Sequence, residues 1–231
     1  REIFEEALTT TASSTQYIMG PEVTKFEKSF ADFLGTGKVV SVASGTDALR
    51  LSCLALDLGP GDEVLVPANS FIASILGLCE LGAQPVPVDV DPKTFLMDLT
   101  DAEHRITSKT KGMIPVHLYG QALNMDSLMD FAQRHELFMI EDACQAHGAE
   151  WNGKRTGTFG ALGCFSFFPS KNLGAFGDGG AIAANDLSLA KKIRLLRNYG
   201  SVQKYNHELP GTNSRLDSIQ AAVLNIKLMF L

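Results

Sequence analysis

The spacing of apolar residues alternates between a helical and a strand-like period along the chain. Residues 21–34 place Val23, Phe26, Phe30 and Phe33 on one side of a helix, as expected for a helix that packs on a core. Further helices are predicted at residues 44–58, 70–81, 126–135, 187–198 and 216–228. Strands are predicted at residues 39–43, 64–66, 86–88, 113–116, 137–140, 164–167 and 181–183. Short apolar strands between helices predict a three-layer α/β fold, with a mostly parallel sheet covered by helices on both faces.

Two features refine this pattern. Pro87 interrupts the strand at 86–88, which is therefore predicted at a sheet edge or a strand end, because proline cannot donate to a neighbouring strand. The basic residues of the 187–198 helix are predicted to form a solvated face. They are Lys191, Lys192, Arg194 and Arg197.

The composition excludes several classes of protein. The chain has 231 residues, of which 45% are hydrophobic, enough for one large α/β domain or a piece of a larger protein. The net charge of −6 argues against general nucleic-acid binding. No signal peptide and no membrane-spanning apolar run occur, so we expect a cytoplasmic protein that does not bind membranes.

The cysteines and histidines favour structural roles. The four cysteines lack CxxC spacing, which favours buried thiols in a reducing compartment over a disulfide framework or a zinc site. The five histidines show no paired ligand spacing, so no catalytic metal is expected. His117 and His147 lie near predicted strand ends, where a structural role is favoured over substrate contact.

Both ends of the chain suggest that more chain exists. The sequence begins at Arg1 without a methionine, and it ends on the apolar helical run 225–231 without a stop signal. We expect a further segment to cover this run.

Ligands of such sheets gather at the carboxyl ends of the strands. Ser44, Gly45 and Thr46 follow a predicted strand and open a helix, where free N–H groups and hydroxyls suit a phosphate. An ordinary N-cap is the alternative for these residues.

Two more predicted strand ends are followed by side chains that can take part in a reaction. Asp142 follows the strand predicted at 137–140, where a buried carboxylate needs a cation or several donors, and Gln145 can donate nearby. Lys171 follows an apolar strand and Pro169, where a partly dry lysine can form a Schiff base with a carbonyl. A helix-capping aspartate and a surface-loop lysine are the alternatives. A phosphate site, a partner for a protonated ring nitrogen and a Schiff-base lysine together describe a pyridoxal phosphate site.

A glycine-rich segment offers a competing nucleotide motif. Residues 148–155 nearly spell a phosphate-binding loop, but Arg155 stands where serine or threonine should hold magnesium. The Asn152-Gly153 pair instead predicts a two-residue hairpin turn.

Five motifs of the chain resemble the DegT/StrS family of fold-type I, pyridoxal-phosphate-dependent sugar aminotransferases. They are the segments 44–49, 115–121, 141–149, 166–174 with 177–180, and 213–217, in the family's order. The resemblance runs from about residue 18 to residue 227. It implies an N-terminal segment at 1–20, a cofactor-binding large domain at 21–231, and a missing C-terminal small domain.

The resemblance also implies roles for single residues. Lys171 would carry the cofactor, Asp142 would pair with its ring nitrogen, and Gln145 would face its phenolic oxygen. Gly45, Thr46 and Ser166 would hold the phosphate, Phe71 would stack on the ring, and Asn213 would reach the phosphate of a neighbouring subunit. A homodimer with shared sites is therefore expected.

The expected reaction is amination of a nucleotide-linked keto sugar, with glutamate as the expected amino donor. The form of segment 168–174 favours relatives that act on 3-keto sugars over those that act on 4-keto sugars. A non-catalytic relative that binds the cofactor and a lyase of the same fold are the alternatives.

Overall fold

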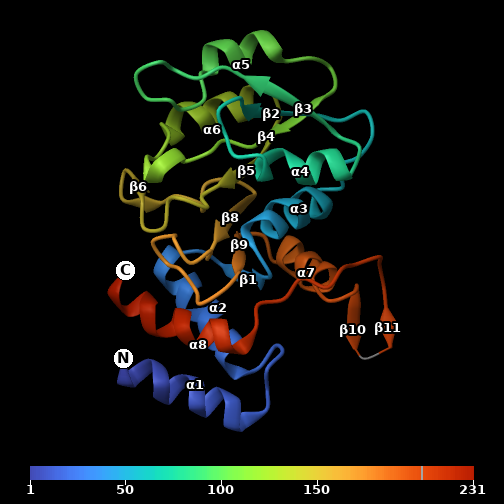
Figure 1. The fold of residues 1–231 in the computed structure, drawn as a ribbon. Coiled ribbons are helices and arrows are strands. Elements are labelled where there is room, and N and C mark those ends of the chain that lie inside the picture. The colour runs from blue at the N-terminus through green and yellow to red at the C-terminus, as the bar shows by residue number, and fades with distance from the viewer. Residues whose placement is uncertain (204) are drawn as a thin grey trace.

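A seven-stranded sheet runs through the middle of the computed structural model, which describes residues 1–203 and 205–231 (Figure 1). Its strands lie in the order β1-β9-β8-β5-β4-β2-β3. Their bounds are β1 Lys38–Val42, β2 Glu63–Pro67, β3 Gln84–Val88, β4 Thr110–Met113, β5 Phe138–Asp142, β8 Leu162–Ser166 and β9 Gly180–Ala184. Strand β9 runs opposite to the other six strands of this sheet, which are parallel to one another. The predicted mostly parallel sheet is therefore confirmed, with β3 at an edge as Pro87 indicated.

Helices cover the sheet on both faces. Those expected from the apolar spacing are α2 Pro21–Leu34, α3 Gly45–Ala55, α4 Ala73–Glu80, α6 Met125–Arg134, α7 Leu187–Leu196 and α8 Ser218–Lys227. Two α-helices escaped prediction, α1 Glu2–Ser14 and α5 Leu99–Arg105. Short 3-10 turns follow at η1 Leu118–Gly120 and η2 Leu228–Phe230. Helix α1 packs against α8 rather than on the sheet (Figure 1).

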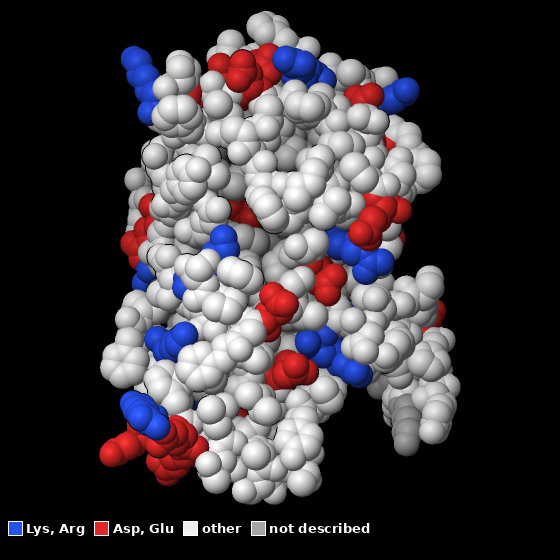
Figure 2. Space-filling view, viewed as in Figure 1, with Lys and Arg blue, Asp and Glu red and all other residues white. Residues whose placement is uncertain are grey.

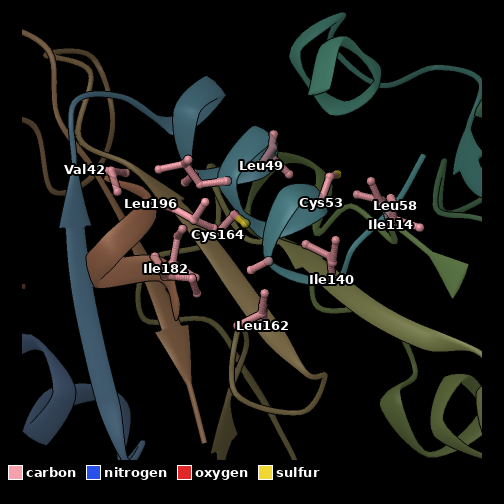
Figure 3. Close-up of a cluster of buried hydrophobic side chains, with 14 of the residues drawn as sticks. Val42, Leu49, Cys53, Leu58, Ile114, Ile140, Leu162, Cys164, Ile182 and Leu196 are labelled. Carbon is pink, nitrogen blue, oxygen red and sulfur yellow. The ribbon is translucent and has the colours of Figure 1, made fainter. Parts of the chain in front are cut away.

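The alternation of side chains along each strand divides the core into two layers. Val64, Val66 and Ile140 share one apolar cluster with residues of α3 and α7, as Figure 3 shows for Ile140, Leu49 and the neighbouring side chains. The residues between them in sequence face the other way: Leu65 and Met139 belong to a cluster that includes side chains of α6.

A further cluster lies on the second face, beneath α2 and α8. Phe26 and Phe30 of α2 pack there on Phe165 and Phe167, with three edge-to-face ring pairs at centroid distances of 5.1 to 5.5 Å. Aromatic pairs prefer this geometry, which adds to the stabilisation from burial. This cluster fixes the end of β8, and the chain continues from there to Lys171.

Two hairpins lie outside the main sheet. Strands β6 Glu150–Trp151 and β7 Lys154–Arg155 pair around Asn152 and Gly153, both with positive φ. The predicted hairpin is therefore confirmed, and the phosphate-loop reading of this segment is wrong. The second hairpin, β10 Ser201–Gln203 and β11 Asn206–His207, projects beside α7 (Figure 1).

One basic side chain of α7 differs from expectation. Arg197 is only 3% exposed, and its Nη1 donates to Glu27 Oε1 at 2.6 Å and to the Ser41 carbonyl at 2.6 Å. The predicted solvated face is therefore wrong for Arg197. It is buried because Glu27 of α2 supplies the opposite charge, and Arg194 adds a second ion pair at 2.8 Å.

The surface in Figure 2 shows acidic and basic side chains interspersed, without an extended area of one sign on this face. No helix of the described residues has both the length and the apolar character needed to cross a membrane.

The cysteines are all free. Cys53 and Cys164 are buried and Cys144 is half-buried, but Cys79 is exposed, so the prediction of buried thiols is wrong at that position.

The buried ion pair leads to a stability prediction. Glu27→Gln should lower the free energy of unfolding by about 3 kcal/mol at pH 7, because Arg197 would stay buried without its counter-charge. Urea unfolding measures this change. Asp32→Asn on the same helix breaks the exposed pair with Lys28 and should change stability by at most about 0.5 kcal/mol.

The same experiment has a defined pH dependence. Burial would raise the pKa of Glu27, but Arg197, Arg194 and the Ser41 N–H together hold it below its ordinary value of 4.5. The stabilisation is therefore complete above pH 4.5 and is lost as the pH falls through the lowered pKa. If the difference in free energy of unfolding between Glu27→Gln and the unaltered protein stays the same at low pH, this account is contradicted.

Candidate active site

A cavity of about 390 Å³ lies at the edge of the sheet where the parallel strands end. Such a volume lies in the range of small-molecule sites. Every predicted site residue except Asn213 lines it: Gly45, Thr46, Phe71, Asp142, Gln145, Ser166 and Lys171. These residues follow or end four different strands, so the parallel order of the sheet brings them together.

The start of α3 forms one end of the cavity. Ser44 is the N-cap: its Oγ accepts from the Asp47 N–H at 3.1 Å, and its carbonyl accepts from the Ala48 N–H. The first N–H groups of a helix have no partner inside it, so those of Gly45 and Thr46 remain for a ligand. A Cβ on Gly45 would lie 2.6 Å from the Ser166 Cβ, so only glycine fits here. The Ser44 hydroxyl therefore caps the helix, and the free backbone N–H groups are the donors at this turn that can bind an anion.

Ser214 braces this turn from a distant part of the chain. Its Oγ accepts from the Ala43 N–H at 3.1 Å and donates to Asp47 Oδ2 at 2.7 Å. Gly180, at the start of β9, approaches so closely that a Cβ there would lie 2.2 Å from the Ser44 carbonyl oxygen. The motif segment 177–180 thus meets the backbone at Ser44, and this close approach explains why residue 180 is a glycine.

Asp142 is a buried carboxylate at the end of β5. Its Oδ2 accepts from the Ser74 hydroxyl at 2.7 Å, and its Oδ1 accepts from the Cys144 N–H at 3.2 Å. The ion pairs of the described residues do not include Asp142. A carboxylate oxygen can accept two hydrogen bonds, so each oxygen has capacity left for a cationic donor in the cavity.

Glu141, the preceding residue, is fully buried and holds the loops around the site. Its carboxylate accepts from the N–H groups of Gly157, Phe159 and Gly160 at 2.6 to 2.7 Å. It also lies 3.0 Å from His117 Nε2. The Leu123 N–H donates to His117 Nδ1, so the proton of this neutral ring is assigned to Nε2, which donates to Glu141. The predicted structural role of His117 is therefore confirmed.

Gln145 is oriented by the turn that follows His117. Its Oε1 accepts from the Tyr119 N–H at 2.8 Å, in the turn where Tyr119 has a φ of 55°. Because its oxygen is engaged, the amide nitrogen of Gln145 is the group available to donate into the cavity.

Lys171 occupies the last position of a β-turn. Its backbone N–H donates to the Phe168 carbonyl at 2.8 Å, and Pro169 stands at the second position, where proline is favoured. The Lys171 side chain is half-buried and lines the cavity, and the ion pairs of the described residues leave its amine unpaired. The alternative of a solvated surface lysine does not describe this position.

Phe71 and Asn213 differ in their relation to the cavity. Phe71 precedes α4 and lines the cavity while remaining 72% exposed, so it is an open aromatic wall. Asn213 is exposed, pairs with Asn198 in an isolated antiparallel bridge, and does not line this cavity. The segment before Asn213 contains the β10–β11 hairpin; Lys204 lies outside the described residues.

His147 and the thiols near the cavity are poorly suited to chemistry. His147 is buried beside the rings of Phe165 and Phe167, and burial lowers its pKa to about 4, so it is neutral at neutral pH. Burial raises the pKa of the Cys144 thiol well above its usual range, so Cys144 lines the cavity as a neutral group. No group of three or more potential metal ligands occurs in residues 1–203 and 205–231.

Sequence reasoning missed the residues that support the site rather than form it. Ser74, which follows β2, donates to Asp142 and is in turn hydrogen-bonded to Ser70. Ser214 supports the turn at the start of α3, and Glu141 accepts from three backbone N–H groups. Serine at a helix start is too common a signal to identify such roles. For Glu141, its place in a buried strand was a usable signal, because a carboxylate there needs several donors.

The arrangement combines three chemical capabilities. The start of α3 can bind an anion, the Asp142 carboxylate can bind a protonated nitrogen, and the Lys171 amine can act as a nucleophile or a base.

Several known proteins with a similar sequence are named as sugar aminotransferases. The chain is 49% identical over 227 residues to dTDP-3-amino-3,4,6-trideoxy-alpha-D-glucose transaminase of Streptomyces venezuelae, covering 98% of this chain and 60% of that relative. It is 50% identical over 208 residues to UDP-N-acetyl-3-dehydro-alpha-D-glucosamine 3-aminotransferase of Acidithiobacillus ferrooxidans, covering 90% of this chain and 56% of that relative. The chain therefore spans less than two thirds of the length of these relatives.

A solved structure shares the fold. NtdA from Bacillus subtilis, determined with the bound cofactor PMP, superposes with a TM-score of 0.94 at 36% identity, covering 100% of this chain and 53% of that one. The sequence model of the DegT/DnrJ/EryC1/StrS aminotransferase family matches residues 1–231. The motif resemblance, the sheet order and these matches agree, and the chain belongs to the DegT/DnrJ/EryC1/StrS aminotransferase family.

Proposed function

We propose that this chain carries the cofactor site of a pyridoxal-phosphate-dependent aminotransferase that aminates a nucleotide-linked keto sugar. The observation that carries the proposal is the convergence of Lys171, Asp142, Gln145 and the start of α3 on one cavity. A lyase or a non-catalytic relative would share the cofactor, so the amino transfer itself rests on the names of the relatives.

The residues of the cavity fit pyridoxal phosphate on three observations. The free N–H groups of Gly45 and Thr46 suit the phosphate, and the absent Cβ at Gly45 leaves room beside Ser166. The buried Asp142 lacks a cation among the described residues, and a protonated ring nitrogen would supply one. The amide nitrogen of Gln145 is free to donate to a phenolic oxygen.

Each residue would then have one task. Gly45, Thr46 and Ser166 would bind the phosphate, Phe71 would stack on the ring, and Gln145 would donate to the ring oxygen. Asp142 would keep the ring nitrogen protonated, and Lys171 would hold the cofactor covalently between reactions. PMP in the solved relative NtdA, the amine form of this cofactor, supports the assignment of the group.

The chemistry divides between the group and the chain. When bound, pyridoxal phosphate withdraws electrons from the carbon that loses a proton. Asp142 supports this withdrawal by stabilising positive charge on the ring nitrogen, an electrostatic effect that is large in a water-excluded site. The Lys171 Nζ, when it is not covalently engaged, would be the base in the cavity that takes this proton from one carbon and delivers it to another.

The names of the relatives also favour a position on the sugar. Both describe amination at carbon 3 of a nucleotide-linked sugar, as the form of segment 168–174 indicated. We therefore extend the proposal to a 3-keto nucleotide sugar, with glutamate as the amino donor.

A homodimer with shared sites completes the proposal. Asn213 lies outside the cavity of its own chain and is exposed on the segment that follows the projecting β10–β11 hairpin. An exposed amide at this place is free to enter the phosphate site of a second copy.

Reduction of the protein with borohydride tests the central assignment. The purified protein should be yellow, and borohydride should link the cofactor to Lys171, as shown by peptide mapping, with no label in Lys171→Ala. Addition of glutamate should shift the visible absorption band if the protein is an aminotransferase. A label at another residue contradicts the role of Lys171, and a labelled protein that ignores every amino donor favours the non-catalytic alternative.

Competition between two substrates tests the position of amination. Offered a 3-keto and a 4-keto nucleotide sugar in parallel with glutamate, the protein should yield a product aminated at carbon 3, as read by NMR. Amination at carbon 4 alone would overturn the preference for a 3-keto sugar and leave the aminotransferase assignment standing.

Mixed dimers test the shared site. Lys171→Ala and Asn213→Ala should each have low activity, because each damages both sites of its homodimer. In mixed dimers one site would have both residues intact, so activity should return to about a quarter to a half of that of the unaltered dimer, the order expected for one site of two. Mixed dimers that form, as shown by mass spectrometry, but recover no activity would refute the sharing.

A further inference from the structure

The Asp142 carboxylate has a partner that none of these roles uses. The Ser74 hydroxyl lies 2.7 Å from Asp142 Oδ2, and the Ser70 hydroxyl lies 2.6 Å from that of Ser74. An ionised carboxylate can only accept, so Ser74 donates to Asp142 and can accept from Ser70. The two serines thus form a directed chain of hydrogen bonds that ends on the carboxylate.

This chain is buried where it meets Asp142. Ser74 is 2% exposed and Asp142 is 6% exposed, and hydrogen bonds to a charged group are strong in such surroundings. The Cys144 N–H donates to the other oxygen, Oδ1, at 3.2 Å. Because the two donors engage different oxygens, rotation of the carboxylate would break at least one of these bonds. Together they fix its plane and leave one lone pair of each oxygen for another donor.

The contact joins two separate strand ends. Ser70 and Ser74 follow β2, whereas Asp142 ends β5, and β4 lies between these strands in the sheet. Phe71 lies on the same turn as the two serines, and the Ser74 N–H donates to its carbonyl at 3.0 Å. The Ser74–Asp142 hydrogen bond therefore also sets the position of Phe71 relative to the Asp142 carboxylate.

We propose that Ser74 is a positioning residue, whose hydroxyl, oriented by Ser70, holds the Asp142 carboxylate toward a ring nitrogen beside Phe71. This inference rests on the proposed function of the site. Ser74 acts through Asp142 and does not line the cavity, whereas Ser70 does. The role of Ser74 is to keep the proton that Asp142 and the ring nitrogen share on the ring nitrogen.

Loss of the Ser74 hydroxyl has a definite electrostatic consequence. A carboxylate that loses a donor becomes more basic, so the shared proton moves from the ring nitrogen toward Asp142. The ring then loses positive charge, and the nearby nitrogen of Lys171 keeps its own proton to higher pH. The other titratable groups near Asp142 are the thiols of Cys144 and Cys164, and burial raises the pKa of both well above their usual range.

The test is a pH titration of the visible absorption of the protein loaded with pyridoxal phosphate. Ser74→Ala should raise the pH midpoint of the absorption change by about one unit, the size expected for one lost hydrogen bond to a charged group. Ser70→Ala should give a smaller shift in the same direction, and Asp142→Asn the largest. Ser74→Thr retains the hydroxyl and should titrate like the unaltered protein.

A matched control separates this role from stability. Ser218 is also a fully buried serine, and its Oγ accepts from the Gly20 N–H at 3.2 Å, away from the cavity. Ser218→Ala should lower the Tm without moving the midpoint. If Ser74→Ala lowers the Tm and leaves the midpoint unchanged, Ser74 is structural only and the inference is overturned.

Two further outcomes are informative. If Ser74→Ala does not fold, Ser74→Cys keeps a side chain of similar shape with a weaker donor and should show the same direction of shift; an unchanged midpoint there overturns the inference. If the unaltered protein forms no borohydride-stable link at Lys171, the proposed function fails and this inference with it. If the unaltered protein forms the borohydride-stable link at Lys171 but the absorption midpoint of the Ser74 variants does not shift, this inference fails and the proposed function stands.

Discussion

The carboxylate of Glu141 is the contact on which the geometry of the site depends. A fully buried negative charge is stable only when donors surround it, and here three backbone N–H groups and His117 do so. Three donors come from residues 157–160, before β8, and His117 lies after β4. One side chain therefore holds both of these loops in place. Through the turn at Tyr119 the constraint reaches Gln145, although Glu141 itself does not line the cavity.

The cavity is assembled by a rule of topology, which is why much of it could be predicted. Apolar periodicity is a local property, and it indicated α2 and most of the strands before any contact was known. The Asn152-Gly153 pair, also a local signal, indicated the hairpin. Once the sheet is parallel, its carboxyl ends share an edge, so residues at those ends must meet. Asn213 could not be treated in this way, because it follows a projecting hairpin rather than a strand of the sheet.

The failures concern polar residues whose partners are distant in sequence. Arg197 has the sequence signature of a solvated helix residue, and only Glu27, 170 positions away, makes its burial possible. Ser74 and Asp142 are separated by 68 positions. Helix α5 was missed because it is short and buries one residue, Ala102, and α1 likewise buries one, Thr11, so neither has a clear apolar stripe. Gly180 is a further example, because the contact that requires a glycine there is with the backbone at Ser44, 136 positions away in sequence.

Strand β5 ends in two adjacent carboxylates that point to opposite faces of the sheet. Glu141 gathers the loops on one side, whereas Asp142 meets Ser74 and the cavity on the other. Because side chains alternate with a period of two, a slip of one residue in the pairing of β5 with β8 would exchange their places. The longer side chain would then enter the cavity, and the loops would lose their anchor. The register of this one strand therefore makes the site sensitive to single-residue insertions and deletions here, even where a change of residue type would be tolerated.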